Sequence, residues 1–151
     1  MTASSDNVVR LVIRSCPSHL PIVRAATEKM CDLVGFDERT AGRVVLSVDE
    51  ALTNVIRHAY GGADDRPIEI EMAPLPGPEP PGLRIVLRDY GPAVDPEDIR
   101  PRDLDDVRPG GLGVHIMRHC MDEVEYAEAP GGGTLLTMIK RVGDDDEGDA
   151  T

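Results

Sequence analysis

The chain has 151 residues, of which 40% are hydrophobic, 29% charged and 3% aromatic, which fits one globular domain with an aliphatic core. Its formal net charge of −12 disfavours direct binding to nucleic acid or to an anionic membrane. Three widely spaced cysteines argue against a disulfide framework or a zinc site, and no apolar run or export signal is evident, so we expect a cytoplasmic protein.

The first half of the chain is predicted to form one strand followed by two helices. Residues 8–14 have the apolar alternation of a half-buried strand, and residues 20–34 have helical apolar spacing that ends at Gly35. Asp37 is a suitable N-cap for a second, longer helix that reaches about His58. Gly61 and Gly62 then end that helix.

The second half reads as strands and one more helix. We expect strands at residues 68–72 and 83–88 around a proline-rich loop, a helical turn at 96–99, and a mobile lid at 100–109. A third helix at 112–121 and a hairpin of residues 124–127 and 134–140 follow. We therefore predict one domain over residues 1–143 and a disordered acidic tail at 144–151.

The long helix carries a polar stripe beside its apolar one. Glu50, Asn54 and His58 recur every four residues and share one side of the helix. Such spacing is most often a solvated face, so the stripe alone does not decide between surface and site.

Two later segments bear glycines where ligands often bind. Asp89-Tyr90-Gly91 follows a strand, which places a carboxylate at the strand end and a glycine where the backbone turns or lets a flat ligand approach. Gly110-Gly111-Leu112-Gly113 opens a helix, whose N-terminal amides can bind phosphate or simply cap a linker.

Together these segments resemble the GHKL ATPases, which have the Bergerat fold. More narrowly, Glu50-Ala-Leu-Thr-Asn54-Val-Ile-Arg-His58-Ala-Tyr60, Gly111-Leu-Gly-Val-His-Ile-Met and Met121-Asp-Glu-Val look like the anti-sigma-factor serine/threonine kinases. The resemblance implies an α+β two-layer sandwich. About three helices would cover one face of a mixed, mostly antiparallel sheet of about five strands, with ATP between the long helix and the lid.

The same resemblance implies roles for single residues. Asn54 would give an oxygen to Mg²⁺, and Glu50 would be the general base toward the attacking hydroxyl. Asp89 would accept from the adenine amino group, and Gly91 and Ala93 would lie against the base. Gly110, Gly111, Leu112 and Gly113 would surround phosphate, and Thr134 would support the adenine end of the pocket.

Two positions depart from the family pattern. Ala93 stands where the adenine loop often has a second glycine, and it adds only one methyl group. Pro109 stands where many of these kinases have an arginine, with Arg108 one residue earlier. Arg57, three residues after Asn54, is either a substitute contact to the γ-phosphate or a solvated side chain.

By resemblance, the protein is an ATP-dependent serine/threonine kinase that phosphorylates a STAS-domain anti-anti-sigma protein and binds a sigma factor or similar regulator. A homodimer is expected by the same analogy. The alternative is a nucleotide-gated protein-binding module with little or no catalysis. ATP hydrolysis of the gyrase type and a histidine-kinase catalytic domain are weaker options, because the chain is short for the extra regions that these proteins use.

Overall fold

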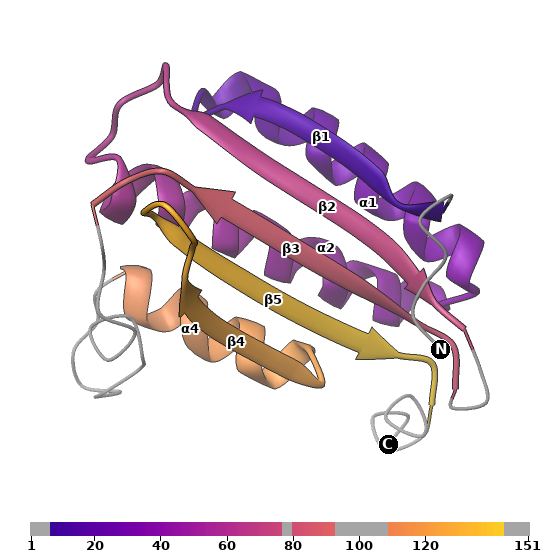
Figure 1. The fold of residues 1–151 in the computed structure, drawn as a ribbon. Coiled ribbons are helices and arrows are strands. Elements are labelled where there is room, and N and C mark those ends of the chain that lie inside the picture. Colours follow the sequence, from indigo (N-terminus) through magenta and orange to yellow (C-terminus); the bar gives the residue numbers. More distant parts are fainter. Residues whose placement is uncertain (1–6, 77–79, 93–108, 144–151) are drawn as a thin grey trace.

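The structure is a computed structural model that describes residues 7–76, 80–92 and 109–143, with the backbone alone for 109–114. It contains five strands in one sheet and three α-helices (Figure 1). The elements in chain order are β1 (Val9–Arg14), η2 (Pro17–His19), α1 (Leu20–Val34), α2 (Glu38–Asn54), η3 (Val55–Ala59), β2 (Pro67–Leu75), β3 (Gly82–Asp89), α4 (Pro109–Cys120), β4 (Glu123–Glu128) and β5 (Thr134–Arg141).

The sheet has the strand order β1-β2-β3-β5-β4. All four described pairings are antiparallel, where we expected a mixed sheet that is mostly antiparallel. Two of these pairings are hairpins, because β2 returns as β3 and β4 returns as β5. The pairing of β3 with β5 then places the end of β3 beside the start of β5, with Arg88 opposite Leu135.

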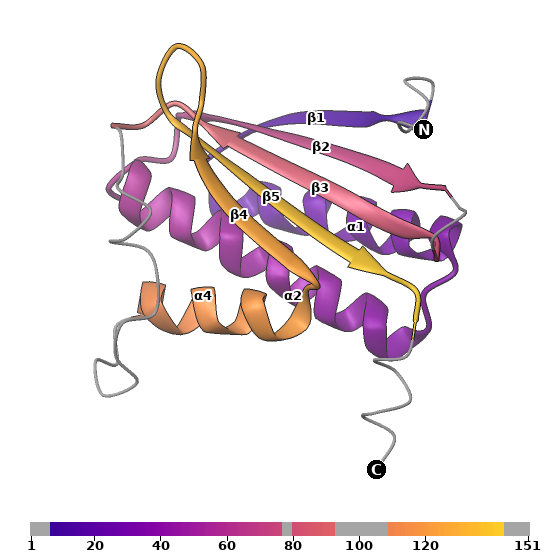
Figure 2. The same cartoon turned by 60° about the horizontal axis from the view of Figure 1, so that its bottom comes forward.

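The three α-helices lie on the same face of the sheet, as both views of the ribbon show (Figures 1 and 2). α2 lies in the middle of this layer, in contact with α1 on one side and α4 on the other. Its buried residues include Val44, Val48 and Leu52, so the predicted apolar stripe does face the core. The α+β two-layer fold class predicted from the sequence is confirmed.

The predicted ends of α1 and the predicted start of α2 agree closely with the structure, whereas the end of α2 and the start of α4, predicted at residue 112 and found at Pro109, differ from it. Gly35 ends α1 in the left-handed conformation at φ 98°, and the Asp37 side chain accepts a hydrogen bond from Thr40 N at 2.8 Å to cap α2. However, α2 does not continue as an α-helix to His58. After Asn54 it widens into a π-helical turn, η3, in which Tyr60 N donates to Val55 O.

Except for β1, which is one residue shorter than predicted, the strands are longer than their apolar alternation predicts. β2 includes Pro74, which we had placed in a loop, and Pro74 lies beyond Met72, the last described residue paired with β1. β2 is an edge strand there, where a missing N–H is tolerated. The predicted turn at 96–99, residues 100–108 of the predicted lid and the acidic tail lie outside the described residues, whereas Pro109 belongs to α4.

None of the described helices combines the length and the low charge content of a membrane span.

Candidate functional site

The structure separates the members of the polar stripe on α2. Glu50 and Asn54 are half-buried, whereas Arg57 and His58 are exposed on the π-helical turn. The wider i→i+5 ring changes the direction in which side chains leave the helix after Asn54, so His58 no longer continues the stripe. Short π-helical turns inside helices are frequent at functional sites, and the sequence pattern had not indicated this one.

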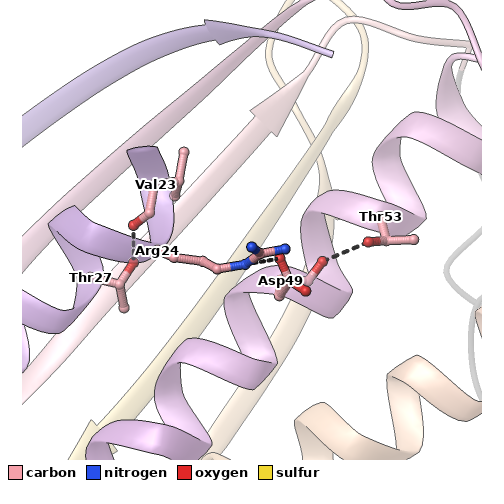
Figure 3. A network of polar contacts seen from close by, with 5 residues as sticks. All are labelled: Val23, Arg24, Thr27, Asp49 and Thr53. Atoms are coloured by element: carbon pink, nitrogen blue, oxygen red, sulfur yellow. Dashed lines mark hydrogen bonds and ion pairs between the residues drawn. The ribbon is translucent and has the colours of Figure 1, made fainter. Parts of the chain in front are cut away.

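An ion pair fixes α1 against α2 immediately before Glu50. Arg24 Nε lies 2.9 Å from Asp49 Oδ1, and Thr53 Oγ1 donates to the Asp49 carbonyl oxygen at 2.9 Å (Figure 3). Thr27 Oγ1 donates to Val23 O one turn along α1. Because both members of the ion pair are partly exposed, its stabilising effect is modest, but it orients the segment that carries Glu50 and Asn54.

Asp89 lies at the end of β3 and is buried, with 5% of its surface exposed. Its Oδ1 accepts a hydrogen bond from Gly91 N at 3.0 Å. Burial raises the pKa of Asp89, and the backbone N–H groups of Gly91 and Thr134, together with the Arg88 charge, offset part of that rise. The carboxylate is therefore held by backbone donors from two separate segments, which brings Asp89, Gly91 and Thr134 together as the sequence analysis expects.

Two glycines around Asp89 leave no room for a side chain. A Cβ at Gly91 would come 2.6 Å from the Ala59 carbonyl oxygen, and a Cβ at Gly133 would collide with the Asp89 carbonyl oxygen. Gly133 also has φ +87°, a conformation that other residues rarely adopt. Gly91 thus lets β3 pass close to the end of η3, a packing reason that its motif did not indicate.

Tyr60 connects the end of η3 to the same region. Its hydroxyl donates to Pro67 O and accepts from Tyr90 N at 2.8 Å. Burial raises the pKa of Tyr60, so the phenol stays protonated and keeps both hydrogen bonds at neutral pH. The sequence analysis included Tyr60 in the family motif but gave it no role, and its place directly after the π-helical turn positions it between α2 and β3.

The glycine segment after the predicted lid forms the first turn of α4. Pro109 begins this helix, and Gly110, Gly111, Leu112 and Gly113 follow within it, so their backbone is helical from the start. The N-terminal N–H groups of such a helix can bind an anion. Ala93 and Arg108 lie outside the described residues.

A second residue to which the sequence analysis gave no role is Tyr126 of β4. Its ring packs against the core, and burial raises its pKa to about 12, with the Arg118 charge and the Asn54 amide offsetting part of the rise. Asn54 Nδ2 and Tyr126 Oη are both fully buried, and neither makes a hydrogen bond of normal geometry among the described residues, although the two side chains lie close to each other. Among the described residues, no cluster of histidine, cysteine and acidic side chains could hold a metal ion.

These features can be compared with known proteins. The model of the family "Histidine kinase-like ATPase domain" matches residues 13–140, which span β1 to β5. The chain belongs to this family. The resemblance seen in the Glu50, Asp89 and glycine motifs is thereby confirmed, and these motifs lie within the matched residues of the ATPase domain.

Curated relatives in this family include serine-protein kinases. The chain is 28% identical over 141 residues to "Serine-protein kinase RsbW" of Bacillus pumilus, covering 88% of this chain and 86% of that protein. It is 25% identical over 143 residues to the protein of the same name from Listeria monocytogenes serotype 4a, covering 89% and 88% respectively. The likeness extends over nearly the whole length of both proteins.

Solved structures agree on the fold. A structure of the RsbU and RsbW domains of a Mycobacterium tuberculosis protein superimposes with a TM-score of 0.62 at 18% identity, covering 89% of this chain and 32% of that chain. The histidine kinase domain of a blue-light activated histidine kinase from Erythrobacter litoralis gives a TM-score of 0.53 at 20% identity, covering 83% and 60%. At these identities, the likeness supports the histidine kinase-type ATPase fold.

Proposed function

We propose that this ATPase-domain protein is an ATP-dependent serine/threonine kinase of the anti-sigma-factor type. The observation that carries the proposal is the buried carboxylate of Asp89, held by backbone donors at the end of β3 inside a matched ATPase domain. The relatives named serine-protein kinase support protein phosphorylation as the activity. A protein of this kind acts in the cytoplasm.

In this proposal the base of ATP is recognised around Asp89. The carboxylate accepts a hydrogen bond from the adenine amino group, beside Gly91 and Ala93, and Thr134 supports the same end. Gly110 to Gly113 at the start of α4 offer N–H groups to the phosphates, since helix N-termini favour anions. Arg108 and Arg57 are the candidate cations for the terminal phosphate.

The residues also fit a magnesium ion. Asn54 is half-buried at the end of α2, and its amide oxygen Oδ1 is the atom that can bind a cation, since Nδ2 is a donor. Mg²⁺ takes oxygen ligands and keeps several waters, so one amide oxygen from Asn54 suits it. When bound, the ion neutralises charge that develops on the phosphates.

Glu50 is the proposed general base. It is half-buried on α2, one turn before Asn54, and the Arg24 to Asp49 ion pair steadies that turn. A carboxylate in this place can take the proton from an attacking protein hydroxyl. The proposed substrate is a serine or threonine of a STAS-domain antagonist, and the same protein binds a sigma factor or similar regulator, as a homodimer.

The first experiment is a thermal shift with and without Mg-ATP. A ligand at a hundred times its dissociation constant stabilises the folded state by about 2.7 kcal/mol, which is easily measured. Labelled ATP and a cognate STAS partner then test transfer. Glu50→Ala should abolish labelling and keep the thermal shift, whereas Glu28→Ala, which removes an exposed carboxylate on α1, should keep both labelling and the thermal shift.

One observation favours the second candidate, a nucleotide-gated binding module. Pro109 begins α4, where proline is structurally favourable, in place of the arginine that the resemblance leads us to expect. A chain without that cation can bind nucleotide and partner without transferring phosphate. Three results together would decide for this module. Mg-ATP would give a thermal shift, the STAS partner would not become labelled, and Glu50→Ala would bind the partner as the wild type does.

A further inference from the structure

The described residues contain three buried side-chain atoms without a hydrogen-bond partner: Asn54 Nδ2, Tyr126 Oη and Arg88 Nε. The guanidinium of Arg88 is otherwise engaged, since its Nη2 donates to Pro130 O at 2.7 Å. In Asn54 the unpartnered atom is the only nitrogen of the side chain, and in Tyr126 it is the only oxygen. Native structures rarely leave such atoms unpaired, so each needs a reason.

These two side chains approach each other from different layers. Val124 and Tyr126 alternate with exposed residues along β4 and pack toward the core, on the face of the sheet that α2 and α4 cover (Figure 2). Asn54 is the last residue of α2. Its amide lies close enough to the Tyr126 hydroxyl to lower the pKa of the phenol against the larger effect of burial.

The amide and the hydroxyl are complementary. An asparagine Nδ2 donates, and a tyrosine oxygen accepts as well as donates. The two ends of an amide diverge, so when Nδ2 faces Tyr126 the Oδ1 atom points away from that enclosed side. Without a fixed partner, either end of the amide can face outward.

We propose that Tyr126 is a positioning residue for the metal-side asparagine. The Tyr126 hydroxyl accepts a hydrogen bond from Asn54 Nδ2 when Mg-ATP is bound, and so presents Oδ1, rather than the amide hydrogens, to the metal. This inference rests on the proposed function, because it requires a metal-bound nucleotide beside Asn54. Tyr126 therefore acts through Asn54, as a positioning residue and not as a catalytic one.

The test uses the full chain and measures Mg²⁺ dependence. Thermal shifts are recorded with ATP at a fixed concentration while Mg²⁺ is titrated, and the Mg²⁺ concentration at half-maximal shift is compared between variants. Tyr126→Phe should raise this concentration about tenfold, the effect typical of residues that orient a metal ligand. Tyr90→Phe is the matched control, because its hydroxyl contacts Glu69 on the opposite face of the sheet.

A double-mutant cycle with Asn54→Ala separates positioning from packing. In the Asn54→Ala background, Tyr126→Phe should cause no further change in the Mg²⁺ midpoint, since its effect passes through the amide. Without ligand, Tyr126→Phe should have an unchanged or higher melting temperature, because it removes a buried hydroxyl that has no partner there.

The outcomes distinguish this inference from the function on which it rests. If the wild-type chain gives no Mg²⁺-dependent shift with ATP, both the proposed function and the role of Tyr126 are wrong. If the wild type responds and Asn54→Ala impairs it, but Tyr126→Phe matches wild type, only the positioning role is overturned. Additive effects in the double variant would also overturn it.

Discussion

The two ends of the proposed nucleotide site differ in how completely the protein satisfies its own polar groups. At the base end, Asp89 accepts from Gly91 N, and the Tyr60 hydroxyl bridges Pro67 and Tyr90. At the phosphate end, Asn54 Nδ2 and Tyr126 Oη are buried without a partner in the described structure. In the proposed site, the base end would thus be formed before the ligand binds, whereas the phosphate end would be completed by the ligand.

This difference has a thermodynamic meaning. Groups that are already held in place lose little entropy when a ligand binds, so the base end can supply affinity and selectivity at low cost. Buried groups without partners lower the stability of the free protein and recover that loss when a ligand pairs them. The phosphate end should thus couple ligand binding to stability more strongly than the base end does.

The largest expected effect on nucleotide binding is at Asp89. Asp89→Asn keeps the shape and the bond from Gly91 N, but its amide offers a donor where the adenine amino group also donates. Hydrogen bonds to charged acceptors contribute about 1.5–3 kcal/mol, so nucleotide affinity should fall roughly ten- to hundredfold. Calorimetric titration with Mg-ATP measures this, with Asp65→Asn in an exposed turn as the control.

The same variant should gain stability without ligand. Burial raises the folded-state pKa of Asp89, so the stability that this group contributes is present at low pH and is lost as the pH rises through that pKa. At neutral pH, Asp89→Asn should therefore have the higher free energy of unfolding, and the difference should shrink on acidification. A loss of stability at neutral pH would contradict a base end that holds its carboxylate against a burial penalty.

The second prediction compares two neighbouring glycines that both have a positive φ angle. Gly132 has φ +110° and Gly133 φ +87°, but only at Gly133 would a Cβ collide with the Asp89 carbonyl oxygen. Both alanine variants should lose about 1–2 kcal/mol from backbone strain, and Gly133→Ala about 1–3 kcal/mol more from overpacking. Urea denaturation of the pair measures the difference, and equal losses would show that Asp89 is not tightly enclosed.

The third prediction compares two tyrosine hydroxyls. Tyr60→Phe leaves Tyr90 N and Pro67 O without their partner and should lower the free energy of unfolding by about 1–3 kcal/mol. Tyr90→Phe removes an exposed contact to Glu69 and should stay within about 0.5 kcal/mol of wild type. Equal stabilities would mean that Tyr60 does not hold the segment after β3.

Most of the fold was predictable because local signals and tertiary packing agree. The cap at Asp37, the stop at Gly35 and the apolar face of α2 depend on neighbouring residues, which a sequence displays directly. The family motifs likewise located Glu50, Asn54 and Asp89.

What could not be predicted depends on contacts between distant segments. The π-helical turn after Asn54 accompanies the packing of Gly91 against Ala59, which are 32 positions apart in the chain and carry no shared pattern. In the sequence, Tyr126 has the pattern of an ordinary inward-facing strand residue. Its proximity to Asn54 follows only from how β4 lies over the helices. The extension of β2 through Pro74 likewise could not be predicted without knowing where the pairing with β1 ends.

The smallest expected effect concerns Arg57, which is exposed on η3 at the phosphate end. If it contacts the γ-phosphate, Arg57→Ala should weaken ATP binding and leave ADP binding unchanged. Exposed ion pairs contribute about 0.2–1 kcal/mol and are screened by salt, so the loss should be fivefold at most and should vanish at high ionic strength. Arg66→Ala, exposed before β2, is the matched control. A salt-insensitive loss well above tenfold would mean that Arg57 becomes enclosed with the ligand, and the phosphate end would then close around ATP more extensively than Asn54 and Tyr126 alone imply.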